Sequence, residues 1–280
     1  MNNADGYHGT EEQKKLAALK AADEIQDHMV LGLGTGSTVY HLIVKLAERI
    51  RGGLSIHAAA TSARTEELAA HYGIPLIPLH GAEQIHLAID GVDAIDPDFH
   101  SIKGGGGALF REKVIALKAL RVIWIMDQSK LVPTLNGLTL PVEVVPFALE
   151  SVEEQVRAMG FASSLRRNGD GMTGDRPDSG RPGRSETDRS RLGRSETDRS
   201  GLTRNNPDAS IFLTDNGNYI LDLQGKEGVD YRLMAGRLKA LTGVVETGMF
   251  GNICEKIIVG TNNGVIVKSP ENHKPQSFKV

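Results

Sequence analysis

Apolar positions near the start of the chain recur at helical spacing, between residues 16 and 25. Thr10, followed three residues later by Gln13, is typical of a capping box and predicts the beginning of that first helix. Residues 28–50, HMVLGLGTGSTVYHLIVKLAERI, then predict a short apolar strand, a glycine-rich turn and an amphipathic helix from about Ser37. The chain therefore opens as helix, strand, turn and helix.

The same alternation continues to about residue 127. Predicted strands are LSIHAAAT (54–61), IPLIPL (74–79), IHLAIDGVD (85–93) and RVIWIMD (121–127), and predicted helices are ARTEELAAHYG (63–73, stopped by Gly73) and LFREKVIALKAL (109–120). Strands that alternate with helices favour an α/β fold, a Rossmann-like parallel sheet with helices on both faces. Because such sheets bind ligands at the carboxyl ends of their strands, we seek chemistry in the loops that follow the strands.

The pattern changes after residue 148. A helix at 149–159 precedes the shorter segments SIFLTD (210–215), NGNYILDL (216–223) and EKIIVGTNNGVIVK (255–268), with a helix over 231–243. Asn216-Gly217 and Asn263-Gly264 are hairpin signals. We predict a main α/β domain over 1–148, and a smaller α+β lobe over 149–167 and 207–268 that returns to the main domain near its end. A flexible tail is predicted over 269–280.

Residues 168–206 stand apart from both predicted parts. RPGRSETDRS is followed at once by RLGRSETDRS, and the two units differ only at Pro182 and Leu192. Eight arginines are balanced by seven acidic residues over this stretch, so it is a polyampholyte with almost no apolar residues to bury. We predict a disordered insertion that loops out at modest entropic cost. Its Ser and Thr content leaves open a phosphorylation-responsive or partner-binding role.

Composition adds little to this picture. The chain of 280 residues is 40% hydrophobic and 24% charged, with a formal net charge of −3, which favours neither a nucleic-acid nor a membrane partner. The single cysteine, Cys254, cannot form an intrachain disulfide and fits a reducing compartment. The polar start has no apolar segment of the kind that a signal peptide needs. We therefore expect a cytoplasmic protein.

The first candidate loop is GLGTGST, residues 32–38. A strand, glycines and then a helix beginning at Ser37 or Thr38 present free N–H groups and the positive end of a helix dipole, which suits an anion. No lysine precedes the Ser/Thr as a P-loop requires. The dinucleotide fingerprint lacks its third glycine and the acidic residue after the next strand. A simple phosphate is favoured over a nucleotide, and a merely structural tight turn stays open.

Two further loops carry charge. Asp90 ends a predicted strand, Asp93 lies three residues on, and Lys103 stands before four glycines whose N–H groups can form an anion-binding nest. Glu112 follows on the next predicted helix. An ordinary Asp-Gly turn and a solvated helix face would each explain one fragment. Together the carboxylates, the cation and the nest supply what is needed to abstract a proton next to a carbonyl and stabilise the enediolate.

At these residues the sequence resembles ribose-5-phosphate isomerase, type A. The runs that carry the resemblance are GLGTGST, TSARTEELAAHYGIPL, DGVDAIDPDFHSIKGGGGALFREK, DQSKLVPTLNGLTLPVEVVPFA, TDNGNYILDL and GVVETGMFGNICEKIIVGTNNGV. They span nearly the whole chain except the first ten or so residues, the insertion and the tail. The combination is highly specific, although each fragment alone is not.

The resemblance implies interconversion of D-ribose 5-phosphate and D-ribulose 5-phosphate through an enediolate, in the non-oxidative pentose phosphate pathway. It implies Glu112 as the general base, with Asp90 and Lys103 as further catalytic residues. It implies a homodimer or homotetramer and no cofactor or metal. Substrate-binding residues implied by position are Thr35, Gly36, Ser37, Thr38, Asp90, Gly91, Val92, Asp93, Lys103, Gly104, Gly105, Gly106 and Lys130.

One departure from the family pattern keeps an alternative open. The family commonly has Asp-Gly-Ala-Asp-Glu, where this chain has Val92 and then Ala94 in place of the glutamate. A sugar-phosphate sensor that binds but no longer turns over its ligand is the alternative that Ala94 raises. A metal-dependent isomerase is less favoured, because the nine histidines are scattered and show no ligand spacing.

Overall fold

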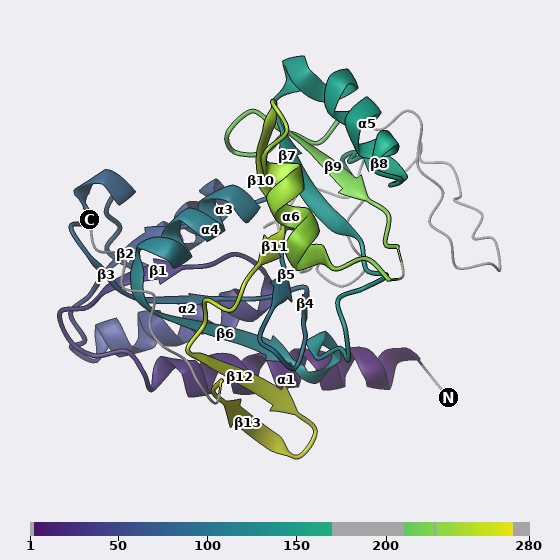
Figure 1. Cartoon of the computed structure of the whole chain (residues 1–280). Coiled ribbons are helices and arrows are strands. Elements are labelled where there is room, and N and C mark those ends of the chain that lie inside the picture. Colours follow the sequence, from purple (N-terminus) through teal and green to yellow (C-terminus); the bar gives the residue numbers. More distant parts are fainter. Residues whose placement is uncertain (1–2, 170–209, 227, 271–280) are drawn as a thin grey trace, which may run out of the picture.

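The computed structural model of the chain describes residues 3–169, 210–226 and 228–270 (Figure 1). The predicted insertion over 168–206 and the predicted tail over 269–280 lie outside these residues, apart from 168–169 and 269–270. No helix in the described ranges has the length and apolar character needed to cross a membrane.

The main sheet has six strands in the order β13-β12-β6-β3-β1-β2. All neighbours are parallel except β13, which pairs with β12 in an antiparallel hairpin. The central strands β1 and β3 and residues 122–127 of β6 are almost fully buried, as expected of strands covered on both faces. The strands are β1 (Val30–Leu33), β2 (His57–Ala60), β3 (Ile85–Asp90), β6 (Ala119–Asp127), β12 (Lys256–Thr261) and β13 (Gly264–Lys268).

Helices cover both faces of this sheet, which confirms the predicted fold class. Figure 1 shows α1 (Asn3–Ala22) and α2 (Ser37–Arg51) on one face and α4 (Leu109–Lys118) on the other, while α3 (Ala63–His71) packs beside β2. The face under α1 and α2 buries a cluster that includes Leu42 and Ile89. The face under α4 buries a second cluster that includes Ile115, Trp124 and Phe250.

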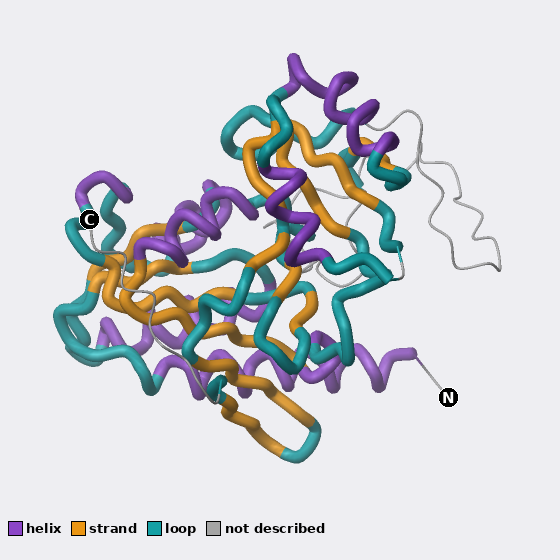
Figure 2. The backbone as a smooth tube through the Cα atoms, in the orientation of Figure 1, coloured by secondary structure: helices purple, strands orange, loops and turns teal. Residues whose placement is uncertain are grey.

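A second, antiparallel sheet and the helices beside it form a further group of elements, called the lobe below. Its order is β10-β7-β9-β8, and Figure 2 shows its strands gathered apart from those of the main sheet. β7 belongs to this sheet although it precedes residue 149, where the lobe was predicted to begin. The chain returns to the main sheet with β12. The elements are β7 (Leu140–Val144), α5 (Leu149–Ala158), β8 (Ser163–Leu165), β9 (Tyr219–Leu223), α6 (Tyr231–Lys239) and β10 (Val244–Thr247).

A small third sheet joins the two parts. It consists of β4 (Ala94–Ile95), β5 (Ser101–Ile102) and β11 (Met249–Phe250), in the order β11-β5-β4. Alternate residues of these short strands face different cores. Ala94 and Ile102 pack in the apolar cluster of the lobe, whereas Ile95 and Phe250 pack in the cluster under α4. The loop that leaves β5 is therefore held between the main sheet and the lobe.

Several predicted boundaries were wrong. The first helix begins at Asn3, so Thr10 lies inside it and is no cap. IPLIPL forms no strand, because Pro75 and Pro78 have no N–H to donate; only the carbonyl of Pro75 and the N–H of Ile77 bond to Ala58 of β2. The helix predicted over 109–120 ends at Lys118, and residues 119 and 120 belong to β6.

The two predicted hairpins have different outcomes. Residues 261–264 do form the turn between β12 and β13, with Gly264 at φ 116°. At Asn216-Gly217 the turn is present, closed by hydrogen bonds between Thr214 and Asn218, but no strand precedes it. Before this turn, Ile211 makes a single bridge to Arg167.

Candidate active site

The predicted catalytic residues meet at the carboxyl ends of the central strands. Asp90 is the last residue of β3, and Lys103 follows β5. Glu112 lies in the first turn of α4. β1 runs parallel to β3 and delivers Gly34 beside Asp90, where a Cβ atom on Gly34 would overlap the carboxylate. Glycine is required at this position because the two loops approach each other so closely.

Lys103 lies between the two carboxylates. Its Nζ is 3.0 Å from Asp90 Oδ2 and 3.3 Å from Glu112 Oε2, and it donates to the carbonyl oxygen of Gly91 at 2.5 Å. The three side chains are only 3%, 5% and 7% exposed for Lys103, Asp90 and Glu112 respectively. The ammonium group also lies 5.3 Å from the centroid of the Trp124 ring. Burying three charged groups carries a desolvation penalty that their mutual attraction often does not outweigh, so such a cluster indicates a function other than stability.

Burial controls the protonation of this cluster. Burial, with added repulsion from Asp90, raises the pKa of Glu112 to about 8, against the attraction of Lys103. Burial also raises the pKa of Asp90, although Lys103 and the N–H groups of Thr35 and Gly91 favour its ionised form. Burial alone would lower the pKa of Lys103, but the attraction of Asp90 and Glu112 outweighs it and raises that pKa. Lys103 therefore remains an ammonium ion, and Glu112 titrates near neutrality.

Asp93 organises the glycine loop. Its Oδ2 accepts from the N–H of Gly105 at 2.7 Å, and the N–H of Gly107 donates to the carbonyl of Gly104 at 3.0 Å. The predicted nest of successive free N–H groups is therefore wrong at Gly105. Within the described part of the chain, the N–H groups of Gly104 and Gly106 donate to no protein acceptor. These two remain to bind an anion.

The turn at 32–38, called the phosphate turn below after its predicted ligand, has the predicted order of strand, glycines and helix. Gly36 adopts φ 114° and precedes α2, whose first residues Ser37 and Thr38 are buried. The Thr35 hydroxyl lies within hydrogen-bonding distance of three other buried hydroxyls, at 2.8 Å from Thr61 Oγ1 and Ser62 Oγ and 3.2 Å from Thr65 Oγ1. These three hydroxyls were not among the predicted site residues, although the run TSART that follows β2 is rich in hydroxyl side chains.

The remaining predicted binding residues are placed less directly. Lys130 ends a short 3-10 helix, Gln128–Lys130, at the same edge of the sheet as Asp90. In the described ranges it makes no hydrogen bond or ion pair with the other predicted residues. Val92 is buried in the apolar cluster under α4, the cluster that also contains Trp124.

The lobe contributes contacts that the sequence analysis did not predict. Asp215 accepts from the N–H of Ala63, the first residue of α3, at 2.8 Å, and Arg111 donates to the carbonyl of Asp215 and to Asn216 Oδ1, both at 2.9 Å. Fully buried Glu143 accepts from three side chains of the same turn, Thr214, Asn216 and Asn218. The turn at 214–218 therefore ties the lobe to both helices beside the site.

A second lobe residue, Arg166, reaches the glycine loop itself. It is 4% exposed and donates to the carbonyls of Gly104 and Gly105, at 2.6 and 3.1 Å. Nothing in the segment SSLRRNG distinguishes Arg166 from a surface arginine, since its partners lie about 60 residues away in the chain.

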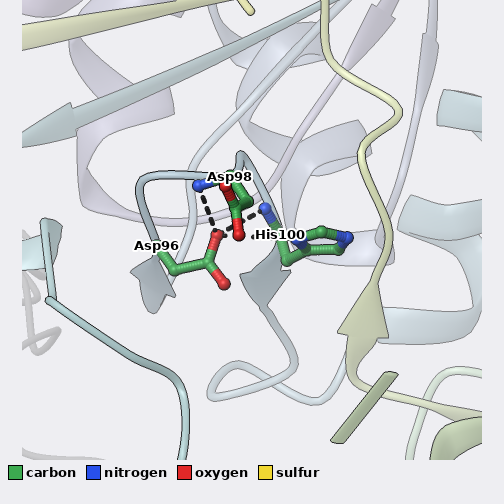
Figure 3. Close-up of side chains that lie close together, drawn as sticks. All are labelled: Asp96, Asp98 and His100. Atoms are coloured by element: carbon green, nitrogen blue, oxygen red, sulfur yellow. Dashed lines mark hydrogen bonds and ion pairs between the residues drawn. The ribbon is translucent and has the colours of Figure 1, made fainter. Parts of the chain in front are cut away.

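Only one group in the described part of the chain has the spacing of a metal site. Asp96, Asp98 and His100 lie together in the loop between β4 and β5 (Figure 3). Asp96 Oδ1 already accepts from the N–H groups of Asp98 and His100, which is the arrangement of an Asx turn. The group belongs to the hairpin of the small sheet and lies outside the Lys103 cluster.

Ala94 is 5% exposed and packs with Ile102 and Met249 in the apolar cluster of the lobe. The residue that departs from the family pattern therefore fills an apolar position beside the site.

Comparison with known proteins gives one consistent result. A model of the family described as ribose 5-phosphate isomerase A (phosphoriboisomerase A) matches residues 57–179 and 184–264. A curated relative from Listeria monocytogenes, ribose-5-phosphate isomerase A, is 37% identical over 254 residues, covering 91% of this chain and 96% of the relative. One of the same name from Sphingopyxis alaskensis is 39% identical over 256 residues, covering 91% and 95%.

Solved structures agree. A D-ribose-5-phosphate isomerase in complex with phospho-erythronic acid is similar with a TM-score of 0.76 and 33% identity, over 93% of this chain and 99% of that one. Ribose 5-phosphate isomerase from Plasmodium falciparum is similar with a TM-score of 0.75 and 30% identity, over 94% of this chain and 100% of that one.

Proposed function

Since the chain belongs to the ribose 5-phosphate isomerase A family, we propose that it interconverts D-ribose 5-phosphate and D-ribulose 5-phosphate, with Glu112 as general base. The observation that carries the proposal is the buried Lys103 ammonium between Asp90 and Glu112, beside free glycine N–H groups. The reaction belongs to the non-oxidative pentose phosphate pathway.

Binding begins at the phosphate turn. Thr35 to Thr38 lie at the positive end of α2, which attracts the phosphate, and Lys130 supplies a cation from the short helix that follows β6. Asp90 assists the opening of the sugar ring and later moves a proton between the two oxygens of the reacting end. The substrate therefore lies with its phosphate at α2 and its C1 and C2 at Lys103.

Proton transfer follows from the charge arrangement. Glu112 takes the proton from C2, the electron pair moves into the enediolate, and the same proton returns to C1. Lys103 and the N–H groups of the glycine loop stabilise the negative oxygen while it exists. A base whose pKa lies near the working pH can both take and return the proton, and Glu112 with a pKa of about 8 meets this condition.

The test is the initial rate of ribose 5-phosphate conversion by the purified chain in the presence of a chelator. We expect turnover there, and a loss of about 10²- to 10⁴-fold in kcat for Glu112→Gln. Glu255→Gln is the matched control, because Glu255 pairs with Arg121 near the amino end of β6, away from the site. Binding without turnover would instead support the sugar-phosphate sensor, and loss of turnover with the chelator would support a metal-dependent enzyme.

The proposal extends to the setting of the enzyme. We expect it to act in the cytoplasm as a homodimer or homotetramer, without a nucleic-acid partner. Light scattering after size exclusion measures the oligomeric state, and a monomer at micromolar concentration would contradict this part.

A further inference from the structure

Arg166 and Asp93 hold the glycine loop from opposite sides. The peptide unit between Gly104 and Gly105 is bonded at both ends, since its carbonyl accepts from Arg166 Nη1 and its N–H donates to Asp93 Oδ2. The next unit, between Gly105 and Gly106, is bonded at its carbonyl only, again by Arg166 Nη1 at 3.1 Å. One guanidinium nitrogen therefore fixes two successive peptide planes.

The direction of the Gly106 N–H follows from this geometry. In a trans peptide the carbonyl and the following N–H point in opposite directions. Because Arg166 holds the Gly105 carbonyl, the N–H of Gly106 points away from Arg166, and in the described ranges it has no protein acceptor. A Cβ atom on Gly106 would lie 4.0 Å from Thr35 Cγ2, so this residue borders the phosphate turn. The Gly106 N–H therefore lies beside the proposed substrate site.

Arg166 itself is rigidly anchored. Its Nε donates to Asp222 Oδ2 at 2.8 Å and its Nη2 pairs with Asp222 Oδ1, which is the bidentate geometry that arginine forms with a carboxylate. The guanidinium side chain is 3% exposed. Asp222 lies in β9 of the lobe, so the lobe provides a fixed support for the loop.

The loop needs such a support. Gly104 and Gly107 adopt φ 111° and 78°, and four glycines in sequence have many alternative backbone conformations. Ordering a residue's backbone costs conformational entropy, and preorganised donors stabilise a transition state best when this ordering is complete before the reaction. Hydrogen bonds from a buried arginine to two carbonyls achieve that ordering.

We propose that Arg166, anchored by Asp222, is a positioning residue that sets the peptide planes of the glycine loop and directs the Gly106 N–H to the oxygen that becomes negative during isomerisation. This inference rests on the proposed function. It assigns the lobe a part in the chemistry through a residue that touches the loop and not the substrate.

The test compares Arg166→Lys and Asp222→Asn with the wild-type chain. A lysine keeps the charge but cannot bond both carbonyls and both oxygens of Asp222. We expect kcat to fall by about 10- to 100-fold, since losing one oxyanion donor outright costs about 10²- to 10³-fold. KM should change by less than about threefold, and inhibition by inorganic phosphate should stay unchanged. Phospho-erythronic acid, whose carboxylate resembles the enediolate, should bind more weakly by a factor similar to the loss in kcat.

Arg121→Lys is the matched control, because Arg121 also bridges two carboxylates, Glu24 and Glu255, near the amino end of β6. It should leave kcat and phospho-erythronic acid binding unchanged. If Arg166→Lys does not fold, Asp222→Asn, which keeps the arginine, supplies the same comparison. A folded variant at either position whose kcat lies within threefold of the wild-type value overturns the inference. A variant in which inhibition by phosphate weakens by the same factor as kcat falls also overturns it. Absence of turnover in the wild-type chain would instead refute the proposed function, while the effect on phospho-erythronic acid binding still tests Arg166.

Discussion

Raising the pH from 6 to 9 is expected to increase kcat/KM for ribose 5-phosphate, and Glu112 is the group responsible. The carboxyl is buried, lies near the Asp90 carboxylate and has a pKa raised to about 8. Only the ionised form can accept the proton from C2. The free enzyme is therefore mostly in its inactive protonation state at pH 6 and mostly in its active state at pH 9.

The size of the effect follows from that pKa. The ionised fraction of Glu112 is about 1% at pH 6, about 10% at pH 7 and about 90% at pH 9, so kcat/KM should rise roughly tenfold per unit at first and then level off. Because Glu112, Asp90 and Lys103 interact strongly, the midpoint of the profile is a property of the cluster. The steep lower limb is the quantity to measure.

The assay is the initial rate at low substrate between pH 5.5 and 9.5, with inhibition by inorganic phosphate followed over the same range. That control is needed because the second pKa of a phosphate group lies near about 6. Asp90→Asn should lower the overall rate and also move the midpoint to lower pH, since it removes the carboxylate that disfavours ionisation of Glu112. Glu255→Gln should leave the midpoint in place.

Two results would refute this reasoning. A profile that is flat between pH 6 and 8 would mean that Glu112 is ionised throughout this range and that burial does not control its pKa. A midpoint that Asp90→Asn leaves unmoved would mean that the two carboxylates do not interact as their positions indicate.

Three further outcomes follow from the same contacts. Glu112→Gln should raise the free energy of unfolding above pH 8 by roughly 2–5 kcal/mol, measured by urea denaturation. The wild-type chain loses stability as the pH rises from about 4.5, where Glu112 ionises in the unfolded state, to about 8, where it ionises in the folded state. Equal stability of the two proteins at pH 9 would contradict this prediction. Gly105→Ala should lower kcat strongly but change the melting temperature little. The added Cβ would lie 2.9 Å from Asp93 Oδ1 and so disturb the glycine loop, whereas the backbone conformation at this position is open to alanine. A normal kcat would count against a role of the glycine loop in the reaction. Glu143→Gln should cost about 1–3 kcal/mol of unfolding free energy by disturbing the acceptor of the turn at 214–218, and an unchanged urea midpoint would argue against that network.

The main sheet and the cluster of Asp90, Lys103 and Glu112 could be predicted from the sequence because their signals are local. Buried parallel strands appear as continuous apolar runs, and Asp90 at the end of such a run marks the edge of the sheet where ligands bind. Lys103 and Glu112 could be grouped with Asp90 because they follow it closely along the chain and because of the family resemblance. The phosphate turn at Thr35 was predictable for the same reason, since a strand, glycines and a helix start occur within seven residues.

The role of the lobe could not be predicted in this way. Arg166 acts on Gly104 from 62 positions away, and Asp215 bonds to Ala63 from 152 positions away. No periodicity links such pairs, because their approach depends on how the small third sheet joins two separate cores. The failed strand at 74–79 has a different cause: apolar character suggested pairing, but Pro75 and Pro78 lack the donors that a ladder requires.

The place of the tryptophan has a practical consequence. The chain contains one tryptophan, Trp124, and its ring lies beneath the Lys103 ammonium and edge-on to Phe250. Tryptophan fluorescence therefore comes from a single buried location next to Lys103. We expect titration of the cluster, or arrival of a sugar phosphate at the proposed site, to change the electric field at that ring. Tryptophan fluorescence in a stopped-flow cell would then follow these events in the unlabelled protein.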